Sequence, residues 1–420
     1  MIVKPLIELS KKISSGLTPL RSNPEFWDNG TIPWLKTEQL GEKYIYETNE
    51  HISEVALEKT AIRLFPVNSL SIAMYGEGKT RGNLSILKKS MATNQACCNV
   101  EIDSDKADYE YVYYFLKTQY DELRQLSSGV RKNLNSNDIK NYPIRLPSSL
   151  DEQRKIACVL KVLDDKLALN NRINAELEAM AKTLYDYWFV QFDFPDADGK
   201  PYKTSGGKME YNATLKREIP AGWNDSILGK FIELDRGVTY SKEDVRTQDD
   251  KDTIGILRAT NVTGNNVDID DLVFIPSSRV NVNQMLNKFD ILIVMSSGSK
   301  EHVGKNGVYY FEKKHAFGAF CSKITPVRKY RYFINTFLQS KWFKSYINNQ
   351  CLGTNINNLT NTHITNCEII CPTPDIVALF ENKMMPIYNK LASNTQENSH
   401  LIQLRDWLLP LLMNGQVTVK

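Results

Sequence analysis

The chain contains 420 residues, of which 42% are hydrophobic and 24% are charged, and its formal net charge is +3 at pH 7. This length leaves room for two domains of ordinary size plus connecting helices. The mildly basic balance permits nucleic-acid binding without requiring it, and the longest apolar stretch, residues 291–295, is far too short to cross a bilayer. Seven cysteines without a regular framework, and an N-terminal sequence that lacks the apolar run of a signal peptide, favour a reducing cytoplasm.

Residues 1–150 are predicted to form a first domain of the α+β class. Its apolar runs at residues 69–74 and 98–102 are short and typical of strands, whereas residues 109–126 have a helical pattern. A domain of this size can bury a core of its own.

Residues 151–192 are predicted to form a long spacer helix. Apolar positions there alternate four and three residues apart, which is the spacing of a coiled coil. The seam runs through Ile156, Leu160, Leu163, Leu167, Asn170, Asn174, Leu177, Ala181, Leu184 and Trp188.

Residues 193–218 are rich in turn-forming residues and are predicted to be a linker. Residues 219–374 are predicted to form a second α+β domain. Its strand-like runs lie at residues 290–295 and 367–371, and its helical pattern lies at residues 332–348.

Residues 375–415 are predicted to form a second spacer helix, because the first seam returns 224 residues later. The repeated seam runs through Phe380, Met384, Ile387, Leu391, Asn394, Asn398, Leu401, Arg405, Leu408 and Leu412. Even the two asparagines recur at the same places. The segments upstream also match: Gly16 and Gly237 begin similar turns, and residues 34–37 resemble residues 256–260. Residues 129–139 likewise parallel residues 353–364. The chain is therefore a tandem duplication of a domain followed by a helix.

The two helices are predicted to pair antiparallel about a pseudo-twofold axis, so that paired residue numbers sum to 568. Asn170 then meets Asn398, and Asn174 meets Asn394, as polar layers that set the register. Such pairing would place the two domains at opposite ends of a rod of roughly 50 Å, which exceeds one turn of DNA at about 34 to 36 Å. The predicted pairing residues are Leu160, Leu163, Leu167, Asn170, Asn174, Leu177, Leu184, Ile387, Leu391, Asn394, Asn398, Leu401 and Leu408.

Three motifs that could carry chemistry are each better explained without it. Residues 73–80 fit a loose phosphate-loop pattern, but a glycine and a strand-like run follow where a helix is needed. Residues 23–26 lack the second proline of the methyltransferase motif Asn-Pro-Pro-aromatic and favour a turn. His363, Cys367 and Cys371 have a spacing that could hold a metal ion on a helix, but residues 364–370 are predicted to form a strand, where residues four apart are about 13 Å from each other. The sequence therefore predicts no catalytic residue and no metal site.

The remaining pattern suits DNA binding: basic residues lie among Gly, Ser, Thr and Asn at comparable places in both copies. The candidate DNA-binding residues are Lys36, Thr37, Tyr75, Lys79, Arg81, Arg131, Lys132, Arg258, Thr260, Ser297, Lys300, Lys305 and Asn355.

Several segments closely resemble Type I restriction-modification specificity subunits. They are residues 151–157, 163–166, 169–174 and 188–194 in the first spacer, 74–76 and 92–98 in the first domain, and 219–223, 296–299, 303–305 and 317–320 in the second. Two departures are present: the Gly222-Trp223 lead-in has no counterpart before the first domain, and the second helix has Asp375 and the residues after it in place of the Glu-Gln-Arg signature.

The resemblance implies a non-enzymatic subunit with two target-recognition domains spaced by two helices, which binds a bipartite, asymmetric target in double-stranded DNA. It also implies two methyltransferase subunits, which carry S-adenosylmethionine and methylate adenine at N6, and motor-nuclease subunits that use ATP and Mg. This chain would itself bind no cofactor. The alternatives are a specificity subunit of a fused methyltransferase-nuclease system, a nucleotide hydrolase that uses residues 73–80, and a coiled-coil scaffold that does not bind DNA.

Overall fold

The computed structural model describes residues 1–76, 80–126, 133–248, 250–350 and 358–419, apart from the side chain of Lys300. The chain divides into two compact units. Unit 1 is Met1–Leu167 with Leu401–Lys420, and unit 2 is Ala168–His400. Each unit therefore holds one α+β domain together with part of each long helix, α5 (Leu150–Tyr185) and α9 (Pro374–Met413).

Unit 1 contains a five-stranded sheet, a three-stranded sheet and a separate strand pair. The five-stranded sheet has the order β2 (Ser10–Ser15), β9 (Cys97–Ile102), β6 (Leu70–Ala73), β7 (Leu84–Leu87) and β4 (Tyr44–Ile45). The three-stranded sheet has the order β5 (Glu50–Ile52), β3 (Ile32–Leu35) and β8 (Ala92–Thr93), and β1 (Ile2–Pro5) pairs with β10 (Pro143–Leu146). The short helices are α1 (Glu54–Lys59), α2 (Tyr109–Thr118), α3 (Tyr120–Gln125) and α4 (Ser136–Lys140).

Unit 2 repeats this topology. Its four-stranded sheet has the order β14 (Ile232–Arg236), β20 (Cys321–Pro326), β17 (Ile291–Val294) and β18 (Asn306–Val308). Its three-stranded sheet has the order β16 (Val273–Pro276), β15 (Thr253–Leu257) and β19 (Ala316–Phe317), and β13 (Asn224–Ile227) pairs with β21 (Glu368–Cys371). The short helices are α6 (Arg331–Gln339), α7 (Lys341–Gln350) and α8 (Asn361–Thr365). The predicted α+β class and the duplication are thus confirmed.

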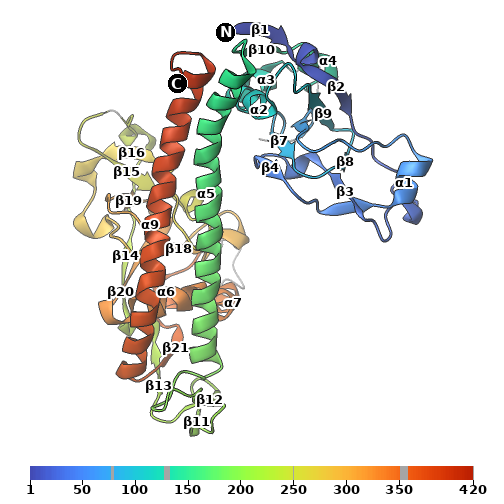
Figure 1. Ribbon diagram of the computed structural model, residues 1–420. Helices are drawn as coiled ribbons and strands as arrows, with labels where there is room; N and C mark the ends of the chain where they lie inside the picture. The colour runs from blue at the N-terminus through green and yellow to red at the C-terminus, as the bar shows by residue number, and fades with distance from the viewer. Residues whose placement is uncertain (77–79, 127–132, 249, 351–357, 420) are drawn as a thin grey trace. The chain divides into compact units, whose positions relative to one another are not determined.

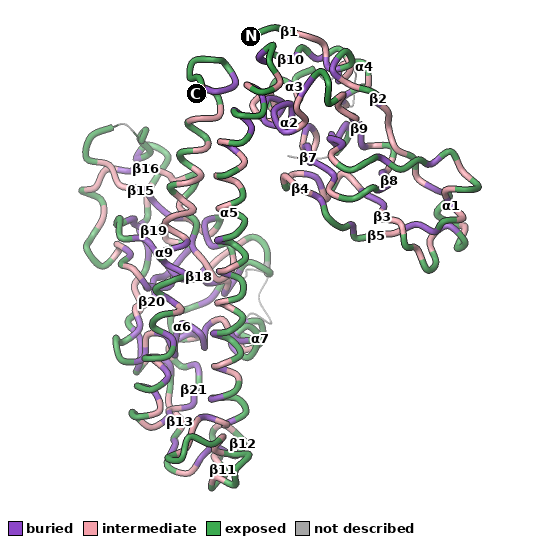
Figure 2. The backbone as a smooth tube through the Cα atoms, in the orientation of Figure 1, coloured by how far each residue is buried: buried purple, intermediate pink, exposed green. Residues whose placement is uncertain are grey.

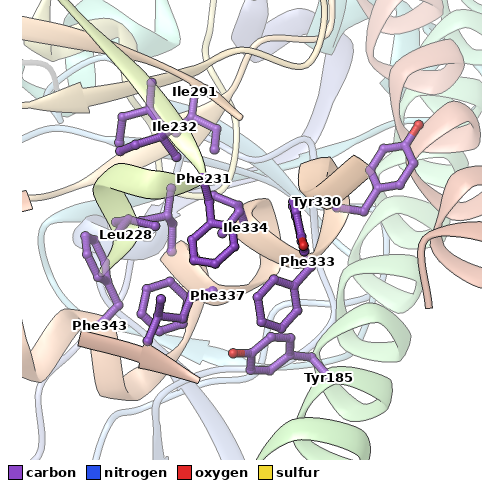
Figure 3. Packing of buried hydrophobic residues seen from close by; sticks show 14 of the residues in the cluster. Tyr185, Leu228, Phe231, Ile232, Ile291, Tyr330, Phe333, Ile334, Phe337 and Phe343 are labelled. Atoms are coloured by element: carbon purple, nitrogen blue, oxygen red, sulfur yellow. The ribbon is translucent and has the colours of Figure 1, made fainter. Parts of the chain in front are cut away.

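The central strands explain why both domains have continuous apolar runs. All four residues of β6 and all four of β17 are buried, because each strand lies between two others and is covered on both faces. Figure 2 shows such buried stretches in the strands and exposed stretches along the connecting loops. In unit 2, an aromatic cluster packs α6 against α5. The ring centroid of Phe333 lies 4.8 Å from that of Phe189 and 5.8 Å from that of Tyr185. Figure 3 shows Phe333 beside Tyr185 within this cluster.

The long helices pair antiparallel (Figure 1). In unit 2, Asn170 Nδ2 donates to Asn398 Oδ1 at 2.9 Å, and Asn394 Nδ2 donates to Asn174 Oδ1 at 2.9 Å. These contacts have the register in which paired numbers sum to 568, as the seam predicts. None of the predicted pairing residues is exposed.

Two local predictions are wrong. The predicted linker contains a hairpin, β11 (Met209–Asn212) with β12 (Arg217–Pro220), and Phe194 before it stacks on Trp223 with ring centroids 4.9 Å apart. Turn residues marked this segment as a linker, but apolar packing orders it within unit 2. The strand predicted over residues 364–370 begins only at Glu368, because residues 361–365 form α8, where Thr360 Oγ1 accepts from the backbone N–H of His363 and caps the helix. The α-helix predicted for the first spacer, residues 151–192, is shorter in the structure. The α-helix α5 ends at Tyr185, and a π-helical turn, Asp186–Val190, follows it.

Candidate nucleic-acid interface

In unit 1, four chain segments far apart in the sequence meet where strands of both sheets end. We call segments 16–18, 35–37, 74–76 and 93–96 the first edge. Backbone hydrogen bonds join them: Leu17 N–H donates to Thr93 O at 2.9 Å, Asn94 N–H to Leu35 O at 2.9 Å, and Met74 N–H to Ala96 O at 2.8 Å. A fourth hydrogen bond ties the segment after β6 to residue 134: Leu134 N–H donates to Met74 O at 3.1 Å. Loop residues at this edge are thereby held by the rigid strands behind them.

Unit 2 contains the same arrangement, formed by segments 237–239, 257–260, 295–297 and 317–320, which we call the second edge. The corresponding bonds run from Val238 N–H to Phe317 O at 2.8 Å, from Gly318 N–H to Leu257 O at 2.9 Å, from Met295 N–H to Phe320 O at 2.8 Å and from Leu359 N–H to Met295 O at 2.7 Å. The backbone of the edge is thus duplicated although most side chains on it differ.

One glycine in each edge is required by close backbone approach. A Cβ atom on Gly16 would lie 2.1 Å from Thr93 O, and one on Gly237 would lie 2.2 Å from Gly318 O. Both distances are far below a van der Waals contact, and the obstructing atoms belong to the backbone. The similarity of these two turns in the sequence therefore reflects the need to pack the turn against the end of β8 or β19.

The predicted DNA-binding residues fall into several groups. Lys36, Thr37 and Tyr75 lie in the first edge, and Arg258, Thr260 and Ser297 lie in the second. Arg81 and Lys305 lie close to these edges in sequence, just before β7 and β18 respectively. Lys79, Arg131, Lys132 and Asn355 lie outside the described residues, as does the side chain of Lys300.

Two of these cations already have acidic partners within their own unit. Lys36 Nζ lies 2.7 Å from Glu38 Oε1 and 2.6 Å from Glu50 Oε1, and hydrogen bonds to these carboxylates raise the pKa of Lys36. Arg258 Nη2 lies 2.8 Å from Asp271 Oδ2. A phosphate that binds either cation must compete with its carboxylate, so these side chains are positioned by the protein before any ligand arrives.

The three alternative motifs have structural explanations. Gly82 and Asn83 lead from the loop directly into strand β7, so no helix N-terminus follows residues 73–80 to receive a phosphate. Asn23 Oδ1 accepts from Glu25 N–H at 3.2 Å and caps a short 3-10 turn. Cys367 is buried, and desolvation raises the pKa of its thiol to about 12. Among the described residues, no group of three or more His, Cys, Asp and Glu side chains is placed to hold a metal ion.

The edges also contain an exposed residue that is not among the predicted DNA-binding residues, although it ends the segment 317–320 that carries part of the resemblance. Phe320 is 68% exposed on the turn between β19 and β20. An isolated phenylalanine next to apolar strands is more often a core residue, so only its position after Gly318, at the end of a strand, could have indicated a turn. None of the helices, within the described part of the chain, is long and apolar enough to span a membrane.

Comparisons with known proteins agree on one family. The model of the Type I restriction modification DNA specificity domain matches residues 3–179. The chain is 27% identical over 417 residues to the Type I restriction enzyme MjaIX specificity subunit of Methanocaldococcus jannaschii, across 97% of this chain and 92% of that protein. It is 30% identical over 208 residues to the EcoKI specificity subunit of Escherichia coli strain K12, across 48% of this chain and 45% of that protein.

A solved structure has the same fold. The crystal structure of the Type I restriction-modification S subunit from M. genitalium superimposes with a TM-score of 0.60 at 17% identity, covering 98% of this chain and 95% of that one. At this identity the likeness concerns the fold alone.

Proposed function

We propose that this chain is a Type I restriction-modification specificity subunit, like the proteins it resembles, and that it recognises a bipartite, asymmetric DNA target, with one half-site read by each edge. The observation that carries this proposal is the duplicated edge. The same backbone hydrogen bonds recur in both units, whereas the side chains they present differ: Tyr75 in the first edge has Ser296 at the corresponding place in the second. Two edges with the same backbone and different side chains would bind two half-sites of different sequence.

The contacts within each edge support a division of labour between positioning and readout. Lys36 and Arg258 are held by carboxylates, so they can bind phosphate only by exchanging one anion for another. Uncharged groups such as Tyr75, Thr260 and Ser297 are free of that competition and can donate to or contact base edges. We assign base readout chiefly to the uncharged side chains.

The catalytic steps are assigned to partners. In this proposal the chain binds two methyltransferase subunits, which carry S-adenosylmethionine and methylate adenine at N6, and it is joined in the full complex by motor-nuclease subunits that use ATP and Mg. The chain itself supplies target recognition, binds no cofactor and acts in the cytoplasm. The absence of a helix after residues 73–80 supports this assignment, because a nucleotide site would need one.

The test combines methylation mapping with half-site competition. The chain and its methyltransferase partner are expressed in a host without adenine methylation, and the modified sequence is mapped; we expect one interrupted, non-palindromic target. Binding of the complex is then measured on duplexes in which either half-site is scrambled. Tyr75→Ala should weaken discrimination at one half-site only, while Tyr46→Ala, an exposed tyrosine outside the first edge, should change neither. A single uninterrupted target, or equal loss at both halves, would contradict the proposal.

A further inference from the structure

Phe320 occupies an unusual position for a phenylalanine. Its side chain is 68% exposed, yet its backbone is fixed. Phe320 O accepts from Met295 N–H at 2.8 Å and from Ser296 N–H at 3.3 Å, and Cys321 N–H donates to Gly318 O at 2.9 Å to close the turn. The turn therefore holds a large apolar ring in solvent with little backbone freedom to lose on binding.

The turn lies between the two segments that carry predicted readout residues of the second edge. Gly318 N–H donates to Leu257 O, next to Arg258, and Phe320 O accepts from the residues just before Ser297. Phe320 is thus on the surface that we propose faces DNA, and not on a remote part of unit 2.

The first edge places an aromatic ring at the same junction by different means. There Met74 N–H donates to Ala96 O, so Ala96 corresponds to Phe320. The exposed ring is instead Tyr75, which follows Met74, and it is 40% exposed. Within the described residues of these junctions, each copy presents one exposed aromatic side chain, on the strand end in one copy and on the turn in the other. Single exposed apolar residues are common on surfaces, but recurrence at equivalent junctions of a duplicated fold indicates a shared use.

The two rings differ in what they can distinguish. Tyr75 has a hydroxyl that can donate to a base edge, whereas the Phe320 ring cannot form such a hydrogen bond. In the major groove, the apolar group that distinguishes one base pair from the others is the thymine C5-methyl, and phenylalanine is among the side chains that contact it.

We propose that Phe320 is a specificity-determining residue of the second edge and contacts the C5-methyl group of one thymine in the second half-site. This inference rests on the proposed function, because it requires that the second edge reads DNA. It assigns apolar readout to one copy of the duplicated junction and polar readout to the other.

The experiment uses the full chain with its methyltransferase partner and duplexes of the mapped target. Each thymine is replaced in turn by deoxyuridine, which lacks only the methyl group, and Kd is measured for the wild type, Phe320→Ala and Tyr211→Ala. Tyr211 is a matched control, since it is 69% exposed in unit 2 on strand β11, outside the second edge. For the wild type, we expect one second-half thymine at which removal of the methyl raises Kd about fourfold, the value of one buried methyl-sized group. With Phe320→Ala the thymine duplex should bind more weakly, and deoxyuridine at that position should have no further effect.

Each outcome is decisive. Methyl sensitivity at one thymine that disappears in Phe320→Ala and persists in Tyr211→Ala supports the assignment. A wild type that prefers the mapped target over a scrambled one but is insensitive to every methyl overturns the assignment and leaves the proposed function intact. Methyl sensitivity that survives in Phe320→Ala also overturns it. Loss of any preference for the mapped target by the wild type would overturn the proposed function together with this inference.

Discussion

The two units attach their domains to the long helices by different chemistry. In unit 1 the junction is a polar network centred on Asp164 of α5. Its carboxylate accepts from the Tyr114 hydroxyl at 2.5 Å and lies 3.2 Å from Arg405 Nη1 of α9 and 3.6 Å from Lys43 Nζ. Lys43 in turn lies 3.0 Å from Glu110. The largely buried Asp164 carboxylate thus links two residues of the domain, Tyr114 and Lys43, to both long helices of unit 1.

In unit 2 the same place is aromatic. Tyr388 of α9 lies 224 residues after Asp164, and it stacks on Tyr332 of α6 with ring centroids 4.7 Å apart. Its hydroxyl is 3.1 Å from Thr336 Oγ1, also of α6. The residue of the long helix that contacts the domain thus lies at the same place in both copies, but its contacts are ionic in unit 1 and aromatic in unit 2.

The same backbone junction can therefore be stabilised in two ways, which differ in how strongly they respond to a substitution. A buried ionic network contributes little net free energy but costs several kcal/mol when one partner is removed, because the remaining charge is left unpaired. An aromatic cluster loses only the contacts that are deleted. Unit 1 should therefore be the more sensitive of the two to substitution of a single polar atom at its junction.

The largest effect is expected from Asp164→Asn. The substitution removes the charge that binds Tyr114, Arg405 and Lys43 in a site where the Lys43 and Asp164 side chains are only 11% and 16% exposed, although Lys43 keeps Glu110 and Arg405 keeps Asp406 as partners. We expect unit 1 to lose about 3 kcal/mol of unfolding free energy, measured by urea denaturation. Asp165→Asn, which breaks only the exposed contact with Lys161, is the control and should cost less than about 1 kcal/mol. Equal effects of the two substitutions would contradict the account of the unit 1 junction.

An effect of similar size, which depends on pH, is expected at Glu381 of α9, in unit 2. Burial raises the pKa of this carboxyl to about 7, although its Oε1 accepts from Phe333 N–H at 2.8 Å. The folded state holds the proton more tightly than the unfolded state, whose pKa is near 4.5. The contribution of Glu381 to the free energy of unfolding is therefore fully present below pH 4.5. It is lost as the pH rises through 7, and the total loss is about 3 kcal/mol.

Glu381→Gln should remove that pH dependence. We expect the variant to be more stable than the wild type at pH 8 and nearly equal to it at pH 4.5, with thermal unfolding followed at both. Glu368→Gln, at an exposed position on β21, is the control and should leave the pH profile unchanged. A wild-type stability of unit 2 that rises between pH 4.5 and 7, with no change in Glu381→Gln, would show that this group is not responsible.

The smallest effect is expected from Tyr388→Phe, which removes one hydroxyl from the unit 2 junction. Thr336 Oγ1 keeps its bond to Tyr332 O at 2.8 Å, and the stacked rings remain. We expect a loss of about 1 kcal/mol or less in the same denaturation experiment. A loss as large as that of Asp164→Asn would remove the contrast between the ionic and the aromatic junction.

The long-range register of the helix pair could be predicted from the sequence because it depends on periodicity. A seam with asparagines at fixed places has one antiparallel alignment that matches polar with polar, and Asn170 with Asn398 and Asn174 with Asn394 have that alignment. The central strands were predictable for a similar reason, since strands that are covered on both faces leave continuous apolar runs.

The candidate site could be predicted only in part. Tyr75 and Ser297 were among the predicted residues, and the structure places both on the edges, just after strands β6 and β17. The carboxylate partners of Lys36 and Arg258 could not be foreseen, because Glu50 and Asp271 come from neighbouring strands or loops whose pairing a single sequence does not reveal. Phe320 was not among the predicted DNA-binding residues, because the sequence of segment 317–320 does not distinguish an exposed ring from a buried one.

The duplication, the α+β class of both domains and the antiparallel register of the helices follow from the amino-acid sequence, because each depends on local periodicity or on repetition along the chain. Which side chains meet at the edges and junctions follows only from the three-dimensional fold. Those contacts join strands and helices that are distant in the sequence, and their free energy depends on burial and on the identity of the partner, as the different environments of Asp164 and Tyr388 show. Local patterns can repeat faithfully while the chemistry at the contacts between them diverges.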